Sequence, residues 1–140
     1  MSHNAIRNKF EEIVSTWAAT VPIRVSYENV AFTPVADEHF IVSELSPVIT
    51  RSRTLTGTDH TEYQGIYQLS VVINEDESVG YANTLAEGIK TLFPIYQPIK
   101  VGTGPSSFTV SPITPVSVMD GLPGNSKYTL PIRFTYRADV

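Results

Sequence analysis

The sequence predicts an α+β fold: two helices packed on one face of a mostly antiparallel, twisted sheet, in a single domain that spans residues 1–140. Three observations lead to this class. Two segments carry apolar residues at helical spacing. Several other segments alternate between apolar and polar residues, as strands do. The connections between these segments are irregular, and several contain proline.

The first predicted helix covers Ser2–Thr20 and ends before Pro22. Its apolar residues recur at helical spacing and form one stripe. We expect the large rings of Phe10 and Trp17 to anchor this helix in the core. The full stripe consists of Ile6, Phe10, Ile13, Val14 and Trp17.

Three strands are predicted in the segment that follows. They cover Ile23–Tyr27, His39–Leu45 and Val48–Leu55, and Pro47 separates the second strand from the third. Side chains alternate in the third strand, so two sets of residues face opposite ways. One face carries Ile49, Arg51, Arg53 and Leu55, and the other carries Val48, Thr50, Ser52 and Thr54.

A polar turn at Thr56–His60, centred on Gly57, joins the third strand to a longer one and predicts a β-hairpin. The longer strand starts near Thr61. Its odd-numbered residues from Tyr63 to Ile73 are mainly apolar and its even-numbered residues are mainly polar, which predicts one buried and one wet face. Gly65 interrupts the apolar face and indicates a bulge or a close approach of another group to the backbone.

The second predicted helix runs from Gly80 to Phe93, follows an acidic turn and ends at Pro94. Loops are predicted at residues 102–107 and 120–126 because glycine, proline and serine gather there. The last segment, Lys127–Ala138, alternates cleanly between apolar and polar residues. We expect it and Tyr63–Ile73 to be the central strands of the sheet.

Composition limits the classes of function. Charged residues make up only 17% of the chain, below the roughly 25% of typical domains, so we expect partners to cover part of its surface. The formal net charge of -4 argues against a protein that grips nucleic acid. The chain contains no cysteine, which excludes disulfides and thiolate chemistry. No apolar run is long enough to span a membrane, and the first residues do not resemble a signal peptide.

The search for catalytic, cofactor-binding and metal-binding motifs identifies none. The three histidines, His3, His39 and His60, lack partners at ligand spacing. The glycine-rich stretch at residues 102–107 has no lysine followed by serine or threonine, as a phosphate loop requires. The sequence therefore predicts a protein that is not an enzyme and needs no cofactor.

The residues that we select as candidate contacts lie on and beside the hairpin: Arg51, Arg53, Thr56, Asp59 and His60. Two interpretations of the arginine pair remain open. Positive charge protects an exposed edge strand from pairing with other chains. The same two side chains also form a basic stripe that fits an acidic partner surface.

The order of the segments resembles that of the tail terminator, or tail completion, proteins of long-tailed bacteriophages. The resemblance spans roughly Ile6 to Val101. Its most telling pieces are "YENVAFTP" at Tyr27–Pro34 and "YQGIYQLSVV" at Tyr63–Val72. Both pieces indicate how the chain folds, and neither is an active-site motif.

The resemblance implies a structural function. Such proteins form a ring, typically of six copies, on the head-proximal end of the tail tube. The ring stops tube polymerisation and offers a surface to the head–tail connector, and DNA passes through it without specific binding. The implied partners are further copies of the chain, the tail tube protein and the connector protein, and the implied location is the virion.

Two alternatives stay open. One is another head–tail connector or neck component, which shares the ring arrangement and differs in its partner. The other is a small α+β enzyme or ligand-binding protein whose curved sheet surrounds an apolar pocket. The almost purely apolar inward faces of the strands count against an enzyme, because a catalytic site needs convergent polar groups.

Overall fold

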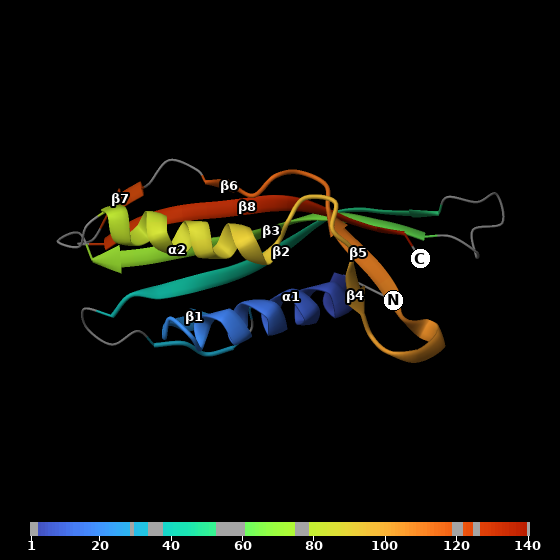
Figure 1. Cartoon of the computed structure of the whole chain (residues 1–140), viewed down its shortest axis with the longest axis horizontal. Coiled ribbons are helices and arrows are strands. Elements are labelled where there is room, and N and C mark those ends of the chain that lie inside the picture. The colour runs from blue at the N-terminus through green and yellow to red at the C-terminus, as the bar shows by residue number, and fades with distance from the viewer. Residues whose placement is uncertain are drawn as a thin grey trace.

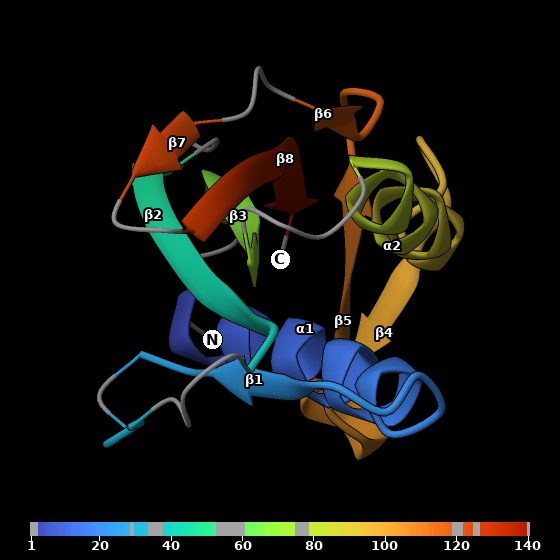
Figure 2. The same ribbon diagram turned by 90° about the vertical axis from the view of Figure 1, so that its left-hand side faces the viewer.

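The computed structural model describes residues 3–28, 30–33, 38–52, 61–74, 79–118, 122–124 and 127–139. Two α-helices, α1 (His3–Ala18) and α2 (Val79–Leu92), accompany a curled sheet (Figures 1 and 2). A short 3₁₀ turn lies at Gly104–Ser106. The strands are β1 (Arg24–Ser26), β2 (Phe40–Ser52), β3 (Thr61–Asn74), β4 (Ile99–Val101), β5 (Phe108–Pro112), β6 (Ser117–Val118), β7 (Leu122–Gly124) and β8 (Lys127–Asp139).

The sheet is mixed. Its strand order is β1-β2-β3-β8-β5-β4, and β6 and β7 also pair with β8. Strands β1 and β2 are parallel, whereas β3 pairs antiparallel with β2 on one side and with β8 on the other. The α+β class, the two helices and the central position of β3 and β8 are therefore confirmed, and the parallel pair at one edge is a feature that the sequence did not indicate.

Strand β2 differs from the prediction, which divided it at Pro47. The strand is continuous from Phe40 to Ser52, and its register against β3 shifts between Pro47 and Ile49. Proline fits there for two reasons. Strand β1 pairs only with the first residues of β2, so Pro47 lies on a sheet edge, and the register shift is itself a β-bulge.

The predicted faces of β3 are correct on one side only. The odd-numbered residues Tyr67, Leu69, Val71 and Ile73 are buried, as expected. On the face expected to be wet, however, Glu62 is fully buried and Ser70 is only 8% exposed. Alternation indicates which residues share a face, but the elements that cover that face lie far away in the sequence.

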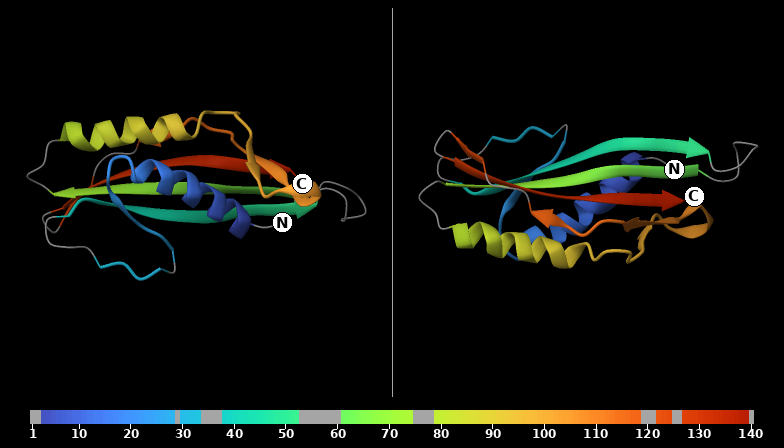
Figure 3. Two further views of the ribbon diagram at one scale, coloured as in Figure 1. Left: turned by 60° about the horizontal axis from the view of Figure 1, so that its bottom comes forward. Right: turned by 90° about the horizontal axis from the view of Figure 1, so that it is seen from above.

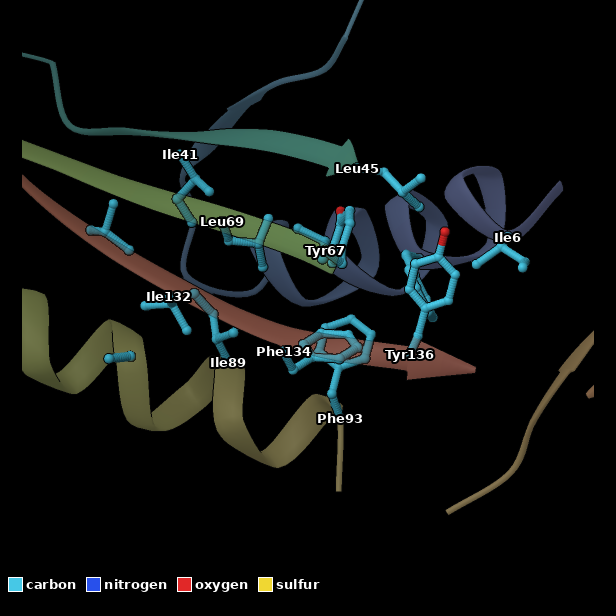
Figure 4. Close-up of a cluster of buried hydrophobic side chains, with 14 of the residues drawn as sticks. Ile6, Ile41, Leu45, Tyr67, Leu69, Ile89, Phe93, Ile132, Phe134 and Tyr136 are labelled. Carbon is cyan, nitrogen blue, oxygen red and sulfur yellow. The ribbon is translucent and has the colours of Figure 1, made fainter. Parts of the chain in front are cut away.

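One core joins both helices to β2, β3 and β8 (Figure 4). Helix α1 contributes Phe10, whose ring centroid lies 5.0 Å from that of Tyr67, 5.4 Å from Phe93 and 5.5 Å from Tyr136. Helix α2 contributes small and aliphatic residues, which let it lie close to the sheet. The buried residues of α2 and its end are Ala82, Leu85, Ala86, Ile89 and Phe93.

Trp17 lies closer to the surface than the sequence predicted. Phe10 is fully buried, which confirms its role as an anchor, but Trp17 is only partly buried. Its ring passes over Gly88 of α2, where an added Cβ would lie 3.0 Å from the indole. Trp17 therefore packs against the core from its rim, beside Gly88 of α2, and the prediction is confirmed for the contact but not for full burial.

The close approach that Gly65 indicated is present. Gly65 pairs with Tyr136 across the sheet, and an added Cβ would lie 2.5 Å from the Tyr136 hydroxyl and 2.7 Å from the Ser46 carbonyl oxygen. The Tyr136 hydroxyl lies 2.5 Å from Nδ1 of His3, whose Nε2 lies 2.8 Å from Oγ1 of Thr50. Burial lowers the pKa of His3 and raises that of Tyr136.

We expect Phe10→Ala to lower the free energy of unfolding by about 3–5 kcal/mol, because it empties a fully buried site between four other aromatic rings. Trp17→Ala should cost about half as much, because water already reaches part of the indole. Urea denaturation of the two variants measures both values. Equal costs would show that Trp17 contributes to the core as much as Phe10 does.

We expect Gly65→Ala to cost about 3 kcal/mol or more, since the new methyl group meets both a buried ring and a backbone carbonyl. Gln64→Ala, one residue away on the partly exposed face, is the matched control and should cost less than about 1 kcal/mol. Thermal and urea unfolding measure both variants. Similar stabilities of the two variants would mean that Tyr136 and Ser46 can move away from an added methyl group at position 65 at little cost.

Candidate assembly surfaces

A cluster of charged residues lies at the end of the sheet from which the predicted hairpin extends. Strand register places Arg51 of β2, Glu62 of β3 and Asp139 of β8 in one row. Arg51 Nε donates to Oε2 of Glu62, and Arg137 Nε lies 3.0 Å from Oε1. Arg137 also binds Asp139 through two hydrogen bonds of 2.9 and 3.2 Å, which raises the pKa of Arg137.

The Glu62 carboxylate is buried, whereas the side chains of Arg51 and Arg137 are 53% and 38% exposed. One buried negative charge thus pairs with two guanidinium groups on the outer face of the sheet, the face opposite the buried odd-numbered side chains of β3. Of the five predicted contact residues, only Arg51 lies within the described part of the chain. Arg53, Thr56, Asp59 and His60 lie outside it.

The sequence analysis missed Glu62 and Arg137 as members of this cluster. A signal for Glu62 was available, because a hairpin turn centred near Gly57 brings residues 51 and 62 face to face, and the two side chains have opposite charges. No comparable signal exists for Arg137, which reaches the cluster through a strand from the far end of the chain.

The outer face of the sheet is polar and carries charges of both signs. One row across three strands holds Glu44, Gln68 and Arg133. Farther along, Gln64 lies opposite Arg137 and Ile66 lies opposite Thr135. Among the residues that the structure describes, charges of both signs are therefore mixed along this face.

The edge of β2 is protected from pairing with other strands. Beyond Val42, β1 no longer pairs with it, and the Glu28 carboxylate accepts a hydrogen bond from the Leu45 backbone nitrogen. Arg7 of α1 lies 3.4 Å from the other oxygen of Glu28. Together with Pro47 and its bulge, this contact leaves few groups on the edge available to an incoming strand.

Apolar side chains are also exposed near the helices. A groove between α1 and α2 is lined by Ile13, Trp17 and Leu92. The turn after α2 exposes Ile95 and Tyr96, which are 40% and 69% accessible. Within the residues that the structure describes, no group of three or more histidine, aspartate or glutamate side chains is arranged to hold a metal ion.

The family model of the phage tail terminator protein matches residues 5–136, nearly the whole chain. The chain belongs to the phage tail terminator protein family. This is a family of structural proteins, and membership implies a component of the phage virion.

A solved structure, of a protein without a descriptive name, resembles this terminator with a TM-score of 0.80 and 29% sequence identity. The match covers 99% of this chain and 96% of the other. No curated protein matches the terminator sequence. None of the helices in the described ranges is long and apolar enough to cross a membrane.

We expect Glu62→Gln in this terminator to lower the free energy of unfolding by about 1–3 kcal/mol, because Arg51 and Arg137 lose the carboxylate that pairs with both. Their partial exposure keeps the cost at this level, since water solvates the freed guanidinium groups. Glu44→Gln, on the same face and exposed, is the control and should change stability by less than about 0.5 kcal/mol. Urea denaturation at low salt measures the free energy of unfolding of both variants. Equal values would show that the pairing of Glu62 with the two arginines does not stabilise the fold.

Proposed function

We propose that this terminator closes the head-proximal end of a phage tail tube as a ring, most simply of six copies. In this role it ends polymerisation of the tube and provides the surface that joins tail to head. The observation that supports the proposal is the family match, which extends over residues 5–136 and so includes both helices and nearly all of the sheet.

The physical properties of the chain fit this role. A closed ring built by head-to-tail contacts needs two different surfaces on each subunit, and a chain with few charged residues can bury such surfaces at low desolvation cost. The net charge of -4 per copy gives an assembled ring a negative charge, which lets DNA pass without specific binding.

The proposed partners are further copies of the chain, the tail tube protein and the connector protein of the head. We propose that the residues selected from the sequence as candidate contacts, Arg51, Arg53, Thr56, Asp59 and His60, take part in these contacts. The proposed location is the head-proximal end of the tail in the virion, after synthesis in the cytoplasm of the host.

Light scattering across a concentration series, with and without purified tail tubes, tests the proposal. We expect a species of about six times the 15.4 kDa mass of the chain, either free or only when tubes are present. A chain that stays monomeric and does not bind tail tubes would contradict the proposal. We also expect a variant with alanine at four candidate contact positions to bind tubes more weakly while it stays folded. These positions are Arg53, Thr56, Asp59 and His60.

The same preparation distinguishes the terminator from a neck component, which is the alternative within phage assembly. Purified tailless heads and purified tail tubes are offered to the protein separately. A terminator should bind tubes in the absence of heads. Binding to heads alone would assign the chain to the neck.

A further inference from the structure

The first residue of α1 ties that helix to the three long strands of the sheet. The helix begins at the end of the sheet where β2 and β8 finish (Figures 1 and 3). There Nδ1 of His3 lies 2.5 Å from the Tyr136 hydroxyl of β8, and Nε2 lies 2.8 Å from Oγ1 of Thr50 of β2. The His3 ring centroid also lies 5.2 Å from that of Tyr63 of β3. One imidazole therefore contacts β2, β3 and β8 from the start of the helix.

The burial of Tyr136 decides which nitrogen of His3 carries the hydrogen. Tyr136 is fully buried, and this burial raises the pKa of its hydroxyl, so the phenol keeps its proton. A buried phenolic hydrogen needs an acceptor, and Nδ1 of His3 lies beside it. A neutral imidazole has one acceptor nitrogen. Nδ1 is therefore the acceptor, and Nε2 carries the hydrogen and donates it to Thr50.

Protonation of His3 removes this acceptor. Both nitrogens of an imidazolium are donors, so Nδ1 then presents a hydrogen to the Tyr136 hydroxyl, which already has its own to donate. The hydroxyl can accept the new bond only by turning its own hydrogen away from Nδ1. A buried donor left without a partner costs free energy. The Thr50 hydroxyl meets no such conflict, because it can accept from Nε2 in both states.

The charge nearest to His3 adds to this cost. Burial of the ring is the main cause that lowers the pKa of His3 from its ordinary value of 6.5. A hydrogen bond with the Ile49 backbone opposes this effect, and the positive charge of Arg7 lowers the pKa further. Glu28 lies 3.4 Å from Arg7 and offsets part of that charge. The lowered pKa shows that burial and the Arg7 charge together outweigh the opposing contact.

The charged side chains of the neighbouring strands lie elsewhere. Arg51 of β2, Glu62 of β3 and Arg137 of β8 pair with one another on the outer face of the sheet, opposite the imidazole. Asp139 pairs with Arg137 there. Lys100 of β4, a strand that also contacts α1, is exposed. Within the described ranges, therefore, no carboxylate is placed to pair with a protonated imidazole at the start of α1.

We propose that His3 is an acid-sensitive clasp: protonation breaks its contact with Tyr136 and releases the first residues of α1 from the end of the sheet. The rest of the helix stays in place, because Ile6 and Phe10 are fully buried in the core. The clasp acts within one copy of the chain and does not depend on assembly. Its release uncovers the end of the sheet that carries the candidate contact Arg51.

The direction of the pH effect follows from the lowered pKa of His3. The released chain takes up a proton at this site near the ordinary value of 6.5, whereas the closed clasp takes it up only at a lower pH. The stabilisation by the clasp is therefore fully present above 6.5 and declines as the pH falls below that value. It levels off below the pKa of the closed clasp.

NMR titration of the full chain measures the closed clasp. We expect the His3 imidazole to titrate below 6.5, with nitrogen chemical shifts that place its hydrogen on Nε2 at neutral pH. His3→Gln identifies the His3 signals and keeps a donor and an acceptor that do not titrate. Tyr136→Phe removes the hydroxyl and should raise the pKa of His3 towards 6.5, because the neutral imidazole loses the hydrogen bond that favours it.

Hydrogen exchange measures the release. The Arg7 amide is the first in α1 that can donate to a carbonyl of the same helix, that of His3. We expect its protection factor to fall about fivefold between about pH 7 and about pH 5 in the wild type, and less than about twofold in His3→Gln. The Val14 amide should stay at least about tenfold better protected throughout, because the helix opens from its beginning. His39→Gln, which replaces another half-buried histidine, is the matched control and should behave like the wild type.

Three results would overturn the proposal: a pKa of His3 at or above 6.5, equal pH responses of the wild type and His3→Gln, or loss of the response in His39→Gln. Circular dichroism and urea unfolding confirm that each variant is folded. If Tyr136→Phe does not fold, the comparison of the wild type with His3→Gln decides alone, because His3 lies at the surface end of the helix and its replacement leaves the core intact.

Discussion

The contact of Tyr136 with the backbone at Gly65 is the constraint on which the rest of this structure depends. The Tyr136 ring lies across β3 at the one inward position without a side chain, and there it meets Phe10 of α1. Its hydroxyl contacts His3, which fixes the first turn of the same helix against the sheet. One ring thus contacts α1 at two points, the Phe10 ring in its middle and the His3 side chain at its beginning.

The bulge opposite Gly65 determines what the end of the sheet presents to solvent. Before the bulge, Ile41, Ser43 and Leu45 of β2 point into the core. Unbroken alternation would also point Arg51 inwards. The extra residue reverses the alternation, so Thr50 faces His3 and Arg51 faces Glu62 on the outer side. The pairing of Arg51 with the buried Glu62 carboxylate is therefore a consequence of the bulge opposite Gly65.

Sequence reasoning predicted the features that local patterns control. The α+β class, the inward residues of β3 and β8, the buried ring of Phe10 and the close approach at Gly65 all follow from spacing within one segment. It failed for the depth at which Trp17 is buried, for Glu62 and for the continuity of β2. In each case the outcome depends on a partner distant in sequence: Gly88 beneath the indole, Arg137 beside the carboxylate, and a sheet edge at Pro47 that tolerates proline.

A protein that ends a polymer must bind the last subunit of that polymer without extending it. For the role proposed here, protected strand edges matter as much as the contact surfaces. Glu28 and Pro47 occupy the edge of β2, and the opposite edge strand, β4, has only three residues. Open-ended pairing of sheets is thereby disfavoured. Contacts between side chains on two different surfaces of each subunit remain, and such contacts can close into a ring of limited size instead of growing into a filament.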